Sequence, residues 1–464
     1  MFLLKHVLRL ILFVTILSFQ GCHQRPTESH QTQKEPNIIF LLTDDHRWDA
    51  LSSMGNSILK TPALDSLALG GLHFTNAYVT TSICAVSRAS ILTGQYESRH
   101  GIHDFKKGLD NEALEKTYPL LLKQHGYRIG FIGKYGVGEA AVHPREKFDF
   151  WECVEQDQPD YENVDEQGNY IHYTDVISNH ITQFLNETEK EPFCLSVSFK
   201  APHVQDGDAR QFIPNPRYLD HFKDVEIPLP KTSDPSYWEY FPDFFRTDEN
   251  IARERWKPRF ATSERYQKSA KDYYRLLTGV DDAVKRLRNE LKQKGLDENT
   301  VIIFMGDNGM FLGEHGLAGK WYPYEESVRV PLIIYDPRKP DLSRRIEHIA
   351  LNIDIAPTIL GLAGLETDGG MQGVDLIDVA KNDRPARIDF FYEHSFFGSP
   401  KLPVSEAVIS PDLKYIIYPE HGFEELYDLT EDPLEEKNLI KDERYQDVVV
   451  HQRERYKELK KEAK

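Results

Sequence analysis

The sequence has few basic residues relative to acidic ones, and it has few cysteines. Among its 464 residues, 56 Lys and Arg stand against 74 Asp and Glu, which gives a formal net charge of −18. A chain with this balance does not bind a polyanion by bulk electrostatics, so we predict no nucleic-acid partner. Four cysteines are too few for a disulfide scaffold. Cys194 lies in an apolar run and is expected to be a small core residue, a bridge to Cys153 being the alternative.

Long apolar runs are also absent beyond the first 21 residues. Lys5 and Arg9 precede an apolar run at 10–19, which is about half of the roughly 20 residues that span a bilayer, so residues 1–21 are predicted to be an export signal. Gly21-Cys22 resembles the end of a bacterial lipoprotein signal, which predicts lipidation of Cys22, with plain cleavage as the alternative. Residues 22–35 would form a tether. We therefore expect an exported protein, in the periplasm or at the cell surface, that is anchored to a membrane by lipid.

The remaining chain has the composition and the pattern of an α/β protein. Apolar residues make up 40% and aromatic residues 11%, which predicts a chain that folds around a core. Strand and helix signals alternate, so a mostly parallel sheet flanked by helices is expected, with functional groups just past the carboxyl ends of its strands. The predicted strands are 37–43, 128–133, 194–199, 300–305 and 331–335, and the predicted helices are 62–69, 112–125, 173–186, 270–294 and 355–363.

Two segments depart from this alternation. Residues 205–262 are rich in Pro, Asp and aromatic residues without a sustained period, and are expected to form a long insertion on the substrate side. After residue 369 the pattern changes to short strands, which predicts a main domain at 36–369 and a smaller antiparallel subdomain at 370–464, closed by a charged helix. The expected short strands are 388–392, 405–410, 414–418 and 426–428.

Oxygen-bearing side chains follow two of the predicted strands. Asp44 and Asp45 end the first strand, and Asp307 and Asn308 follow the apolar run 301–306. Adjacent carboxylates repel each other, and a hard divalent cation such as Ca²⁺ or Mg²⁺ would relieve that repulsion. A helix cap with a solvated acid is the alternative for the first pair alone. Two such strand ends together favour one metal site without the Cys and His cluster that zinc prefers.

A cysteine stands at the start of a predicted helix, four residues before an arginine. A helix N-terminus and the Arg88 guanidinium both favour anions, and both would lower the pKa of the Cys84 thiol. Alone, this pattern fits a thiol nucleophile or a buried cysteine. Together with the acidic strand ends, Cys84-Ala-Val-Ser-Arg88 followed by Leu92-Thr-Gly94 resembles the signature of the type I sulfatases, Cys-x-Pro/Ala-x-Arg and then Leu-Thr-Gly.

The resemblance extends from Asn37 to about Leu439. Further blocks that resemble the family are 36–45, 126–134, Lys200-Ala-Pro-His203, 307–320, 324–331 and, near the end, 425–439. It implies an alkaline phosphatase-like α/β fold in which 36–369 is the catalytic domain. It also implies that a formylglycine-generating maturase converts Cys84 to formylglycine, whose hydrated aldehyde attacks sulfur.

The resemblance assigns roles to further residues. Arg88 would stabilise the aldehyde hydrate, Lys134 and Lys320 would contact sulfate oxygens, and His203 would protonate the leaving oxygen. One Ca²⁺ ion, with Mg²⁺ as the less favoured alternative, would be held by Asp44, Asp45, Cys84, Asp307 and Asn308.

Two positions depart from the family pattern. Val86 stands where Pro or Ala is usual, and Gly136 stands where the family commonly has a His that contacts formylglycine. His315 is a candidate replacement for that His, with a loop or metal-neighbouring histidine as the alternative. His394 is a candidate substrate-pocket residue, with a structural role as the alternative.

The function predicted from these observations is a calcium-dependent sulfatase that acts on a sulfated carbohydrate, such as an oligosaccharide from ulvan or from a glycosaminoglycan. Two other functions remain open at this point. One is a phosphomonoesterase or phosphodiesterase of the same superfamily, which would use an unmodified nucleophile and usually two metals. The other is a non-catalytic glycan-binding lipoprotein in which Cys84 stays a thiol.

Overall fold

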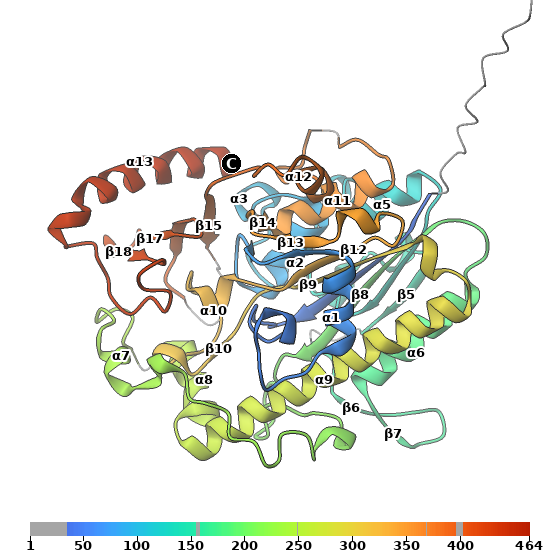
Figure 1. Cartoon of the computed structure of the whole chain (residues 1–464), viewed down its shortest axis with the longest axis horizontal. Helices are drawn as coiled ribbons and strands as arrows, with labels where there is room; N and C mark the ends of the chain where they lie inside the picture. Colours follow the sequence, from blue (N-terminus) through green and yellow to red (C-terminus); the bar gives the residue numbers. More distant parts are fainter. Residues whose placement is uncertain (1–34, 155–157, 248, 368, 396–401) are drawn as a thin grey trace, which may run out of the picture. The chain divides into compact units, whose positions relative to one another are not determined.

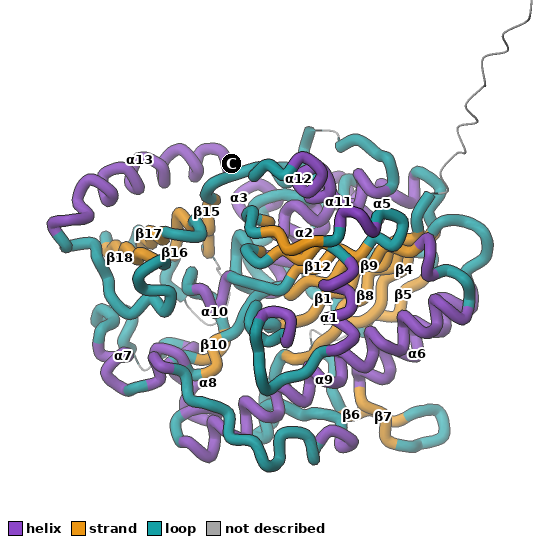
Figure 2. The backbone as a smooth tube through the Cα atoms, in the orientation of Figure 1, coloured by secondary structure: helices purple, strands orange, loops and turns teal. Residues whose placement is uncertain are grey.

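A mixed eight-stranded sheet forms the centre of the structure, which is a computed structural model (Figures 1 and 2). Its middle strand, β1, pairs in parallel with β9 on one side and β8 on the other. The antiparallel member, β12, pairs with β9 and β2. In spatial order the strands are β13 (Arg344–Ile346), β2 (Leu72–Phe74), β12 (Leu332–Tyr335), β9 (Thr300–Gly306), β1 (Asn37–Asp44), β8 (Phe193–Pro202), β4 (Arg128–Gly133) and β5 (Phe150–Cys153).

The structure describes residues 35–154, 158–247, 249–367, 369–395 and 402–464. The predicted export signal, the lipidation site Cys22 and most of the tether lie outside the described residues. Residues 36–464 form one compact unit. Within the described ranges, no helix is both long enough and apolar enough to cross a membrane.

The central strands are mainly apolar because both faces of the sheet are covered. In β1, Ile39 and Leu41 pack into the core beneath one face, whereas Ile38 and Phe40 pack into the core beneath the other. Alternate side chains of a strand point to opposite faces, so a strand buried on both sides reads as a continuous apolar run. This explains why the sequence predicted the middle strands well.

Three helices cover the first face: α1 (Pro62–Gly70), α6 (Tyr173–Glu187) and α9 (Ser263–Gln293) (Figure 1). Helix α9 starts seven residues before the predicted position 270. The Thr262 side chain accepts a hydrogen bond from the Arg265 backbone N–H and so begins the helix earlier than the apolar stripe indicates.

The second face packs against α2 (Cys84–Thr93), α5 (Tyr118–Gln124), α11 (Ile355–Leu362) and α12 (Leu376–Asn382). The single helix predicted at 112–125 is wrong. The structure has two helices, α4 (Asn111–Glu115) and α5, because Pro119 lies in the first turn of α5 and cannot continue a preceding helix. The cysteine bridge considered above is also absent, since Cys84, Cys153 and Cys194 are all free.

A four-stranded antiparallel sheet follows the main sheet along the chain. It contains β15 (Phe390–His394), β16 (Ser405–Ile409), β17 (Leu413–Tyr418) and β18 (Phe423–Asp428), and α13 (Gln446–Ala463) packs against it. It begins after α12, which packs with α11 in the main core. Lys414 of this sheet lies between Glu325 and Glu435, all three buried, at 3.0 Å and 2.7 Å. The ion pair with Glu325 links β17 to α10 (Glu325–Val328).

The insertion at 205–262 contains helices that its composition did not predict. They are α7 (Pro235–Glu239) and α8 (Ile251–Phe260). Helix α8 has the sequence IARERWKPRF, in which charged residues outnumber apolar ones, so no apolar period indicates a helix. Asn250 caps its first turn by accepting hydrogen bonds from the Ala252 and Arg253 backbone N–H groups.

Candidate active site

The predicted site residues meet at the carboxyl ends of β9, β1 and β8. Thr43 of β1 pairs with Gly306 of β9, and the Asp307 N–H donates to the Thr43 carbonyl at 2.8 Å. This pairing brings Asp44 and Asp307 to the same edge of the sheet. Cys84, at the start of α2, and His203, directly after β8, complete the group. One ligand atom each from Asp44, Asp45, Cys84 and His203 lie within 4.8 Å of one another.

Cys84 is buried between a carboxylate and a lysine. Its Sγ lies 3.2 Å from Asp44 Oδ1 and 2.8 Å from Lys320 Nζ. Burial and the Asp44 charge raise the pKa of the thiol to about 12, although Lys134 and Lys320 act in the opposite direction. The predicted lowering of this pKa is therefore wrong, because desolvation outweighs the helix N-terminus and Arg88. At neutral pH the unmodified thiol is protonated and is a poor nucleophile.

Three carboxylates and three cations are buried together around Cys84. Arg88 forms ion pairs with Asp307 at 2.9 Å and with Asp44 at 3.5 Å. Asp44 also pairs with Lys134, and Asp45 pairs with Lys320. Each charge has a partner of opposite sign, which a buried charge requires.

The pKa values of the two carboxyl groups nearest Arg88, those of Asp44 and Asp307, shift in opposite directions. Burial alone would raise the pKa of Asp44, but Lys134, His203 and Lys320 hold it well below its usual range. Burial and the neighbouring Asp44 charge raise the pKa of Asp307 to about 6. The charge of Asp307 is therefore less compensated than that of Asp44.

The oxygen donors at this edge fit a hard divalent cation. Asn308 Oδ1 is buried and has no hydrogen-bond partner among the described residues, while its Nδ2 donates to Asp45 Oδ1 at 2.6 Å and to the Gly309 carbonyl. Asp307 Oδ1 accepts from the Asp45 N–H at 3.1 Å, which joins both strand ends. An unpaired buried oxygen beside three carboxylates matches the donor chemistry of Ca²⁺ or Mg²⁺.

His203 is oriented by the backbone. Its Nδ1 lies 2.8 Å from the Val204 carbonyl, which can only accept, so Nδ1 carries the hydrogen. Nε2 lies 3.6 Å from Asp45 Oδ2. Burial lowers the pKa of His203 to about 4, although Asp44 and Asp45 act to raise it. His203 can therefore donate a proton from Nε2 only in its doubly protonated form.

Gly136, the departure from the family pattern, lies against Arg88. It has a φ of +72°, and a Cβ there would lie 2.9 Å from Arg88 Cδ. The Arg88 guanidinium is fixed by hydrogen bonds to the Lys134 carbonyl and to the Ser198 hydroxyl, so it has little freedom to move. Arg88 thus occupies space that a side chain at position 136 would need.

His315 and His394 do not join this group of charges. His315 packs among aromatic rings, with centroid distances of 5.6 Å to Tyr324 and 5.8 Å to Tyr237. His394 ends β15, and burial lowers its pKa to about 4 although the charge of Glu97 acts in the opposite direction. Val86 is fully buried in the core that Tyr78 and Trp321 share.

Lys200 lies near Lys134 and Asp44 and was named in the sequence analysis only as part of the block Lys200-Ala-Pro-His203, without a role of its own. It lies in β8, its Nζ donates to Gln205 Oε1, and it stacks over the Tyr161 ring at 4.4 Å. Burial and the nearby Lys134 lower its pKa to about 8. A lysine in a fully buried strand pattern was the available signal.

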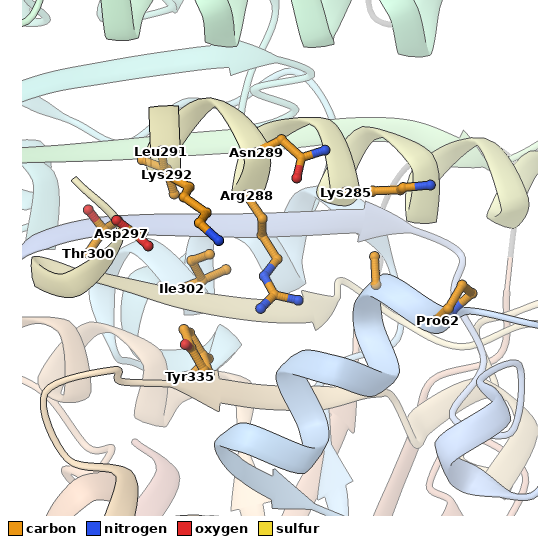
Figure 3. A pocket seen from close by; sticks show the side chains of 11 residues that line it. Pro62, Lys285, Arg288, Asn289, Leu291, Lys292, Asp297, Thr300, Ile302 and Tyr335 are labelled. Atoms are coloured by element: carbon orange, nitrogen blue, oxygen red, sulfur yellow. The ribbon is translucent and has the colours of Figure 1, made fainter. Parts of the chain in front are cut away.

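A separate cavity of about 490 Å³ lies at the opposite end of β9 (Figure 3). Thr300, at the start of β9, and Tyr335 of β12 line it together with Lys285, Arg288 and Lys292 of α9. Asp297 is the one carboxylate among its lining residues, and none of them is a cysteine or histidine. The cavity thus lacks the nucleophile and the paired carboxylates found at the carboxyl end of the sheet.

Comparison with known proteins identifies the family of the chain. A family model described as sulfatase matches residues 36–365, and one described as N-sulphoglucosamine sulphohydrolase, C-terminal, matches residues 313–462. An N-acetylglucosamine-6-O-sulfatase of Bacteroides thetaiotaomicron is 29% identical over 498 residues, covering 93% of this chain and 87% of that protein. An ulvan-active sulfatase of Formosa agariphila is 28% identical over 455 residues, covering 93% of this chain and 82% of its own length.

A solved structure, of a protein in complex with its substrate D-glucosamine-2-N,6-O-disulfate, superposes on this fold. It is 28% identical to this chain and has a TM-score of 0.79, with coverage of 93% of this chain and 98% of that chain.

The contact between Gly136 and Arg88 predicts the effect of one substitution. Gly136→Ala should reduce stability through positive-φ strain of about 1–3 kcal/mol, and should also displace Arg88 and reduce turnover of an aryl sulfate. Gly168→Ala is the matched control, because Gly168 has a φ of +81° and a Cβ added there would meet no atom within 4 Å. Urea unfolding and kcat of both variants measure the two effects. Equal losses in the two variants would contradict the role of the Arg88 contact.

Proposed function

The chain belongs to the sulfatase family and is an enzyme that hydrolyses sulfate esters, and we propose that it acts on a sulfated carbohydrate through a formylglycine at position 84. Its α/β fold is that of the alkaline phosphatase-like superfamily. The observation that carries the proposal is the position of Cys84, which touches both Asp44 and Lys320 at the carboxyl edge of the sheet.

The state of the Cys84 thiol supports modification. A nucleophile with a pKa near 12 is almost entirely protonated at neutral pH, so the unmodified side chain does not account for efficient catalysis. Converted to formylglycine, the same position supplies a hydrated aldehyde whose hydroxyl attacks sulfur. Lys320 Nζ lies next to Cys84 Sγ, and Arg88 pairs with the adjacent Asp44. Both cations can therefore stabilise negative charge that develops at position 84.

The surrounding residues suit a tetrahedral anion. Lys134 and Lys320 place one ammonium group beside each carboxylate oxygen of Asp44, and a sulfate oxygen can replace part of these contacts. Ca²⁺ held by Asp44, Asp45, Asp307 and Asn308 would supply further positive charge for the sulfate oxygens. Full burial of the site raises the strength of these interactions.

His203 is positioned to protonate the leaving oxygen. Its Nε2 faces the cluster while Nδ1 is bound to the Val204 carbonyl. A sugar leaves as an alkoxide, which is a poor leaving group and needs a proton. An anionic substrate next to Nε2 would favour the doubly protonated ring.

The names of the relatives support the substrate class. The two relatives described above are named for their carbohydrate substrates, N-acetylglucosamine 6-O-sulfate and ulvan. The solved structure contains a sulfated glucosamine. We propose a 6-sulfated glucosamine residue of a glycosaminoglycan as the substrate, with ulvan as the second polysaccharide to examine. From the sequence, we also propose export and lipidation at Cys22.

The mass of the peptide that contains Cys84 tests the central proposal. Protein made together with a formylglycine-generating maturase should carry the aldehyde at position 84, whereas Cys194 in the same digest should keep its thiol as an internal control. Protein made without a maturase, and the variant Cys84→Ala, should lack sulfatase activity. Full activity in a preparation whose position 84 is entirely thiol would refute the formylglycine assignment.

Calcium binding is tested by stability as well as by activity. Ca²⁺ at about 100 times its Kd should stabilise the metal-free protein by about 2.7 kcal/mol, because it binds the folded state alone. Asp307→Asn should abolish this gain in thermal unfolding.

Asp281→Asn is the control for the calcium experiment. Asp281 is also a buried carboxyl group, with a pKa raised by burial to about 6, but it accepts hydrogen bonds from the Ala63 and Leu64 N–H groups. Its variant should lose stability yet keep the response to Ca²⁺. A full response in Asp307→Asn would place the ion elsewhere.

The role of His203 is tested with two leaving groups. His203→Ala should reduce kcat on a sulfated sugar about 10²- to 10⁴-fold more than on p-nitrophenyl sulfate, whose aryl oxide leaves without a proton. The proton donor is the doubly protonated form, so kcat on the sugar should fall as pH rises through the pKa of His203 in the substrate complex. Lys320→Ala should reduce both rates alike. Equal losses for His203→Ala on both substrates would mean that it only binds sulfate.

A further inference from the structure

Arg259 is a buried cation with little compensation. It lies near the end of α8, its side chain is about 3% exposed, and its Nε donates to the Gln211 amide oxygen at 2.7 Å. Among the described residues, no carboxylate oxygen lies within 4 Å of a guanidinium nitrogen of Arg259, the distance that would make an ion pair. Buried arginines are usually paired, so this one lacks its customary partner.

Arg255 lies one helical turn before Arg259, on the same face of α8. Its guanidinium lies 3.7 Å from Asp206 Oδ1 and stacks over the Trp321 ring at 5.1 Å. Asp206 follows His203 by three residues, and Trp321 directly follows Lys320. Both neighbours of Arg255 are therefore attached to segments that carry residues of the catalytic cluster.

The electrostatic interactions connect the arginines to that cluster. Burial and the like charge of Arg255 lower the pKa of Arg259 to about 9, against the opposing effect of Asp206 and Asp45. The pKa of Asp206 is lowered by His203, Arg255, Arg259 and Lys320, although its partial burial acts to raise it. Asp206 thus lies between the two groups of charges, and Arg259 stays protonated at neutral pH without adequate neutralisation.

Helix α8 is fixed to the segment that carries Lys320. Arg253 donates to the Gly316 carbonyl at 2.9 Å, and its guanidinium lies over both Trp238 and Trp256. The helix also packs against β11 (Ala318–Gly319), which directly precedes Lys320. Arg253 therefore has a structural role, whereas Arg255 and Arg259, on the other face, are held at a constant place relative to Lys320.

We propose that Arg255 and Arg259 bind a second anionic group of the substrate, a sulfate or a carboxylate on the same sugar or on the next one. This inference rests on the proposed function, since it assumes that the first sulfate is held at Cys84. Two guanidinium groups offer bidentate donors to a sulfate or carboxylate, and the Trp321 ring offers an apolar surface to a sugar. Asp206 pairs with Arg255 in the free enzyme and is displaced toward solvent when the second anion binds.

The test compares substrates that have one anionic group with substrates that have two. N-acetylglucosamine 6-sulfate has one sulfate, glucosamine 2-N,6-O-disulfate adds a second sulfate, and a disaccharide with uronic acid linked to 6-sulfated glucosamine adds a carboxylate. The wild-type enzyme should have a kcat/KM at least 10-fold higher for one or both of the dianionic substrates, and which of them is preferred identifies the group that binds. Charge-assisted hydrogen bonds in a buried site support effects of about 10- to 100-fold.

Variants of the two arginines then assign the effect. Arg255→Gln and Arg259→Gln should each lower kcat/KM for the preferred dianionic substrate about 10-fold or more, mainly through KM, and leave turnover of p-nitrophenyl sulfate unchanged. Arg259→Lys should restore part of the loss because it keeps the charge. Arg265→Gln, which removes an exposed arginine bonded to the Lys257 carbonyl, is the control and should have no effect.

The outcomes separate this inference from the proposed function. Hydrolysis of p-nitrophenyl sulfate by the wild-type enzyme, without any preference for dianionic sugars in kcat/KM or in calorimetric binding to Cys84→Ala, would refute the subsite and leave the sulfatase intact. Equal losses on all substrates in folded Arg255→Gln would also refute it. Absence of sulfate ester hydrolysis by matured enzyme would instead refute the proposed function. Calorimetric binding of the disulfate to Cys84→Ala, weakened in Cys84→Ala/Arg255→Gln, would still support the subsite.

Discussion

The balance of buried charge at the carboxyl edge of the sheet is the constraint on which the rest of the site depends. Asp44, Asp45 and Asp307 are fully or almost fully buried, and each has a cation within ion-pair distance. Removing a carboxylate from water is unfavourable by several kcal/mol unless its charge is neutralised nearby. The strand order β9, β1, β8 brings together acidic and basic groups from distant parts of the sequence, and so makes their burial tolerable.

This balance also determines the properties of the residues around it. Arg88 extends from the first turns of α2 to Asp307. Its guanidinium donates hydrogen bonds to three acceptors, which are the Asp307 carboxylate, the Lys134 carbonyl and the Ser198 hydroxyl. A Cβ at position 136 would lie 2.9 Å from Arg88 Cδ, so a side chain there would require Arg88 to move. The same burial keeps the Cys84 thiol protonated, so the surroundings that stabilise an anionic substrate do not by themselves activate the thiol.

The sequence predicted the parts of this arrangement that depend on local pattern. The strands β1 and β9 contain continuous apolar runs, β8 is largely apolar, and the carboxylates that follow the runs of β1 and β9 were visible as candidate ligands. The helix boundaries were predicted less accurately, because the apolar period does not determine them. Thr262 caps the start of α9, and Pro119, which lacks an N–H, marks the start of α5. The predicted direction of the pKa shift of Cys84 was wrong, because burial and the charge of Asp44 raise this pKa. Cys84 and Asp44 lie 40 residues apart, so their contact cannot be read from the local sequence. Helix α8, half of whose residues are charged, gave no periodic signal.

The chain therefore separates two tasks between two kinds of structure. The groups that contact the nucleophile position lie at strand ends or at the start of α2, where backbone pairing fixes them. The insertion at 205–262 packs into the hydrophobic cores of this framework, and its polar contacts include the hydrogen bond from Arg253 to Gly316 and the cation–π contact of Arg255 with Trp321. Among the described residues, Arg255 and Arg259 form no ion pair with Asp44, Asp45 or Asp307, so their replacement removes none of the ion pairs of the buried cluster. Substrate preference can then change through the insertion while the charge arrangement that supports sulfate ester hydrolysis is preserved.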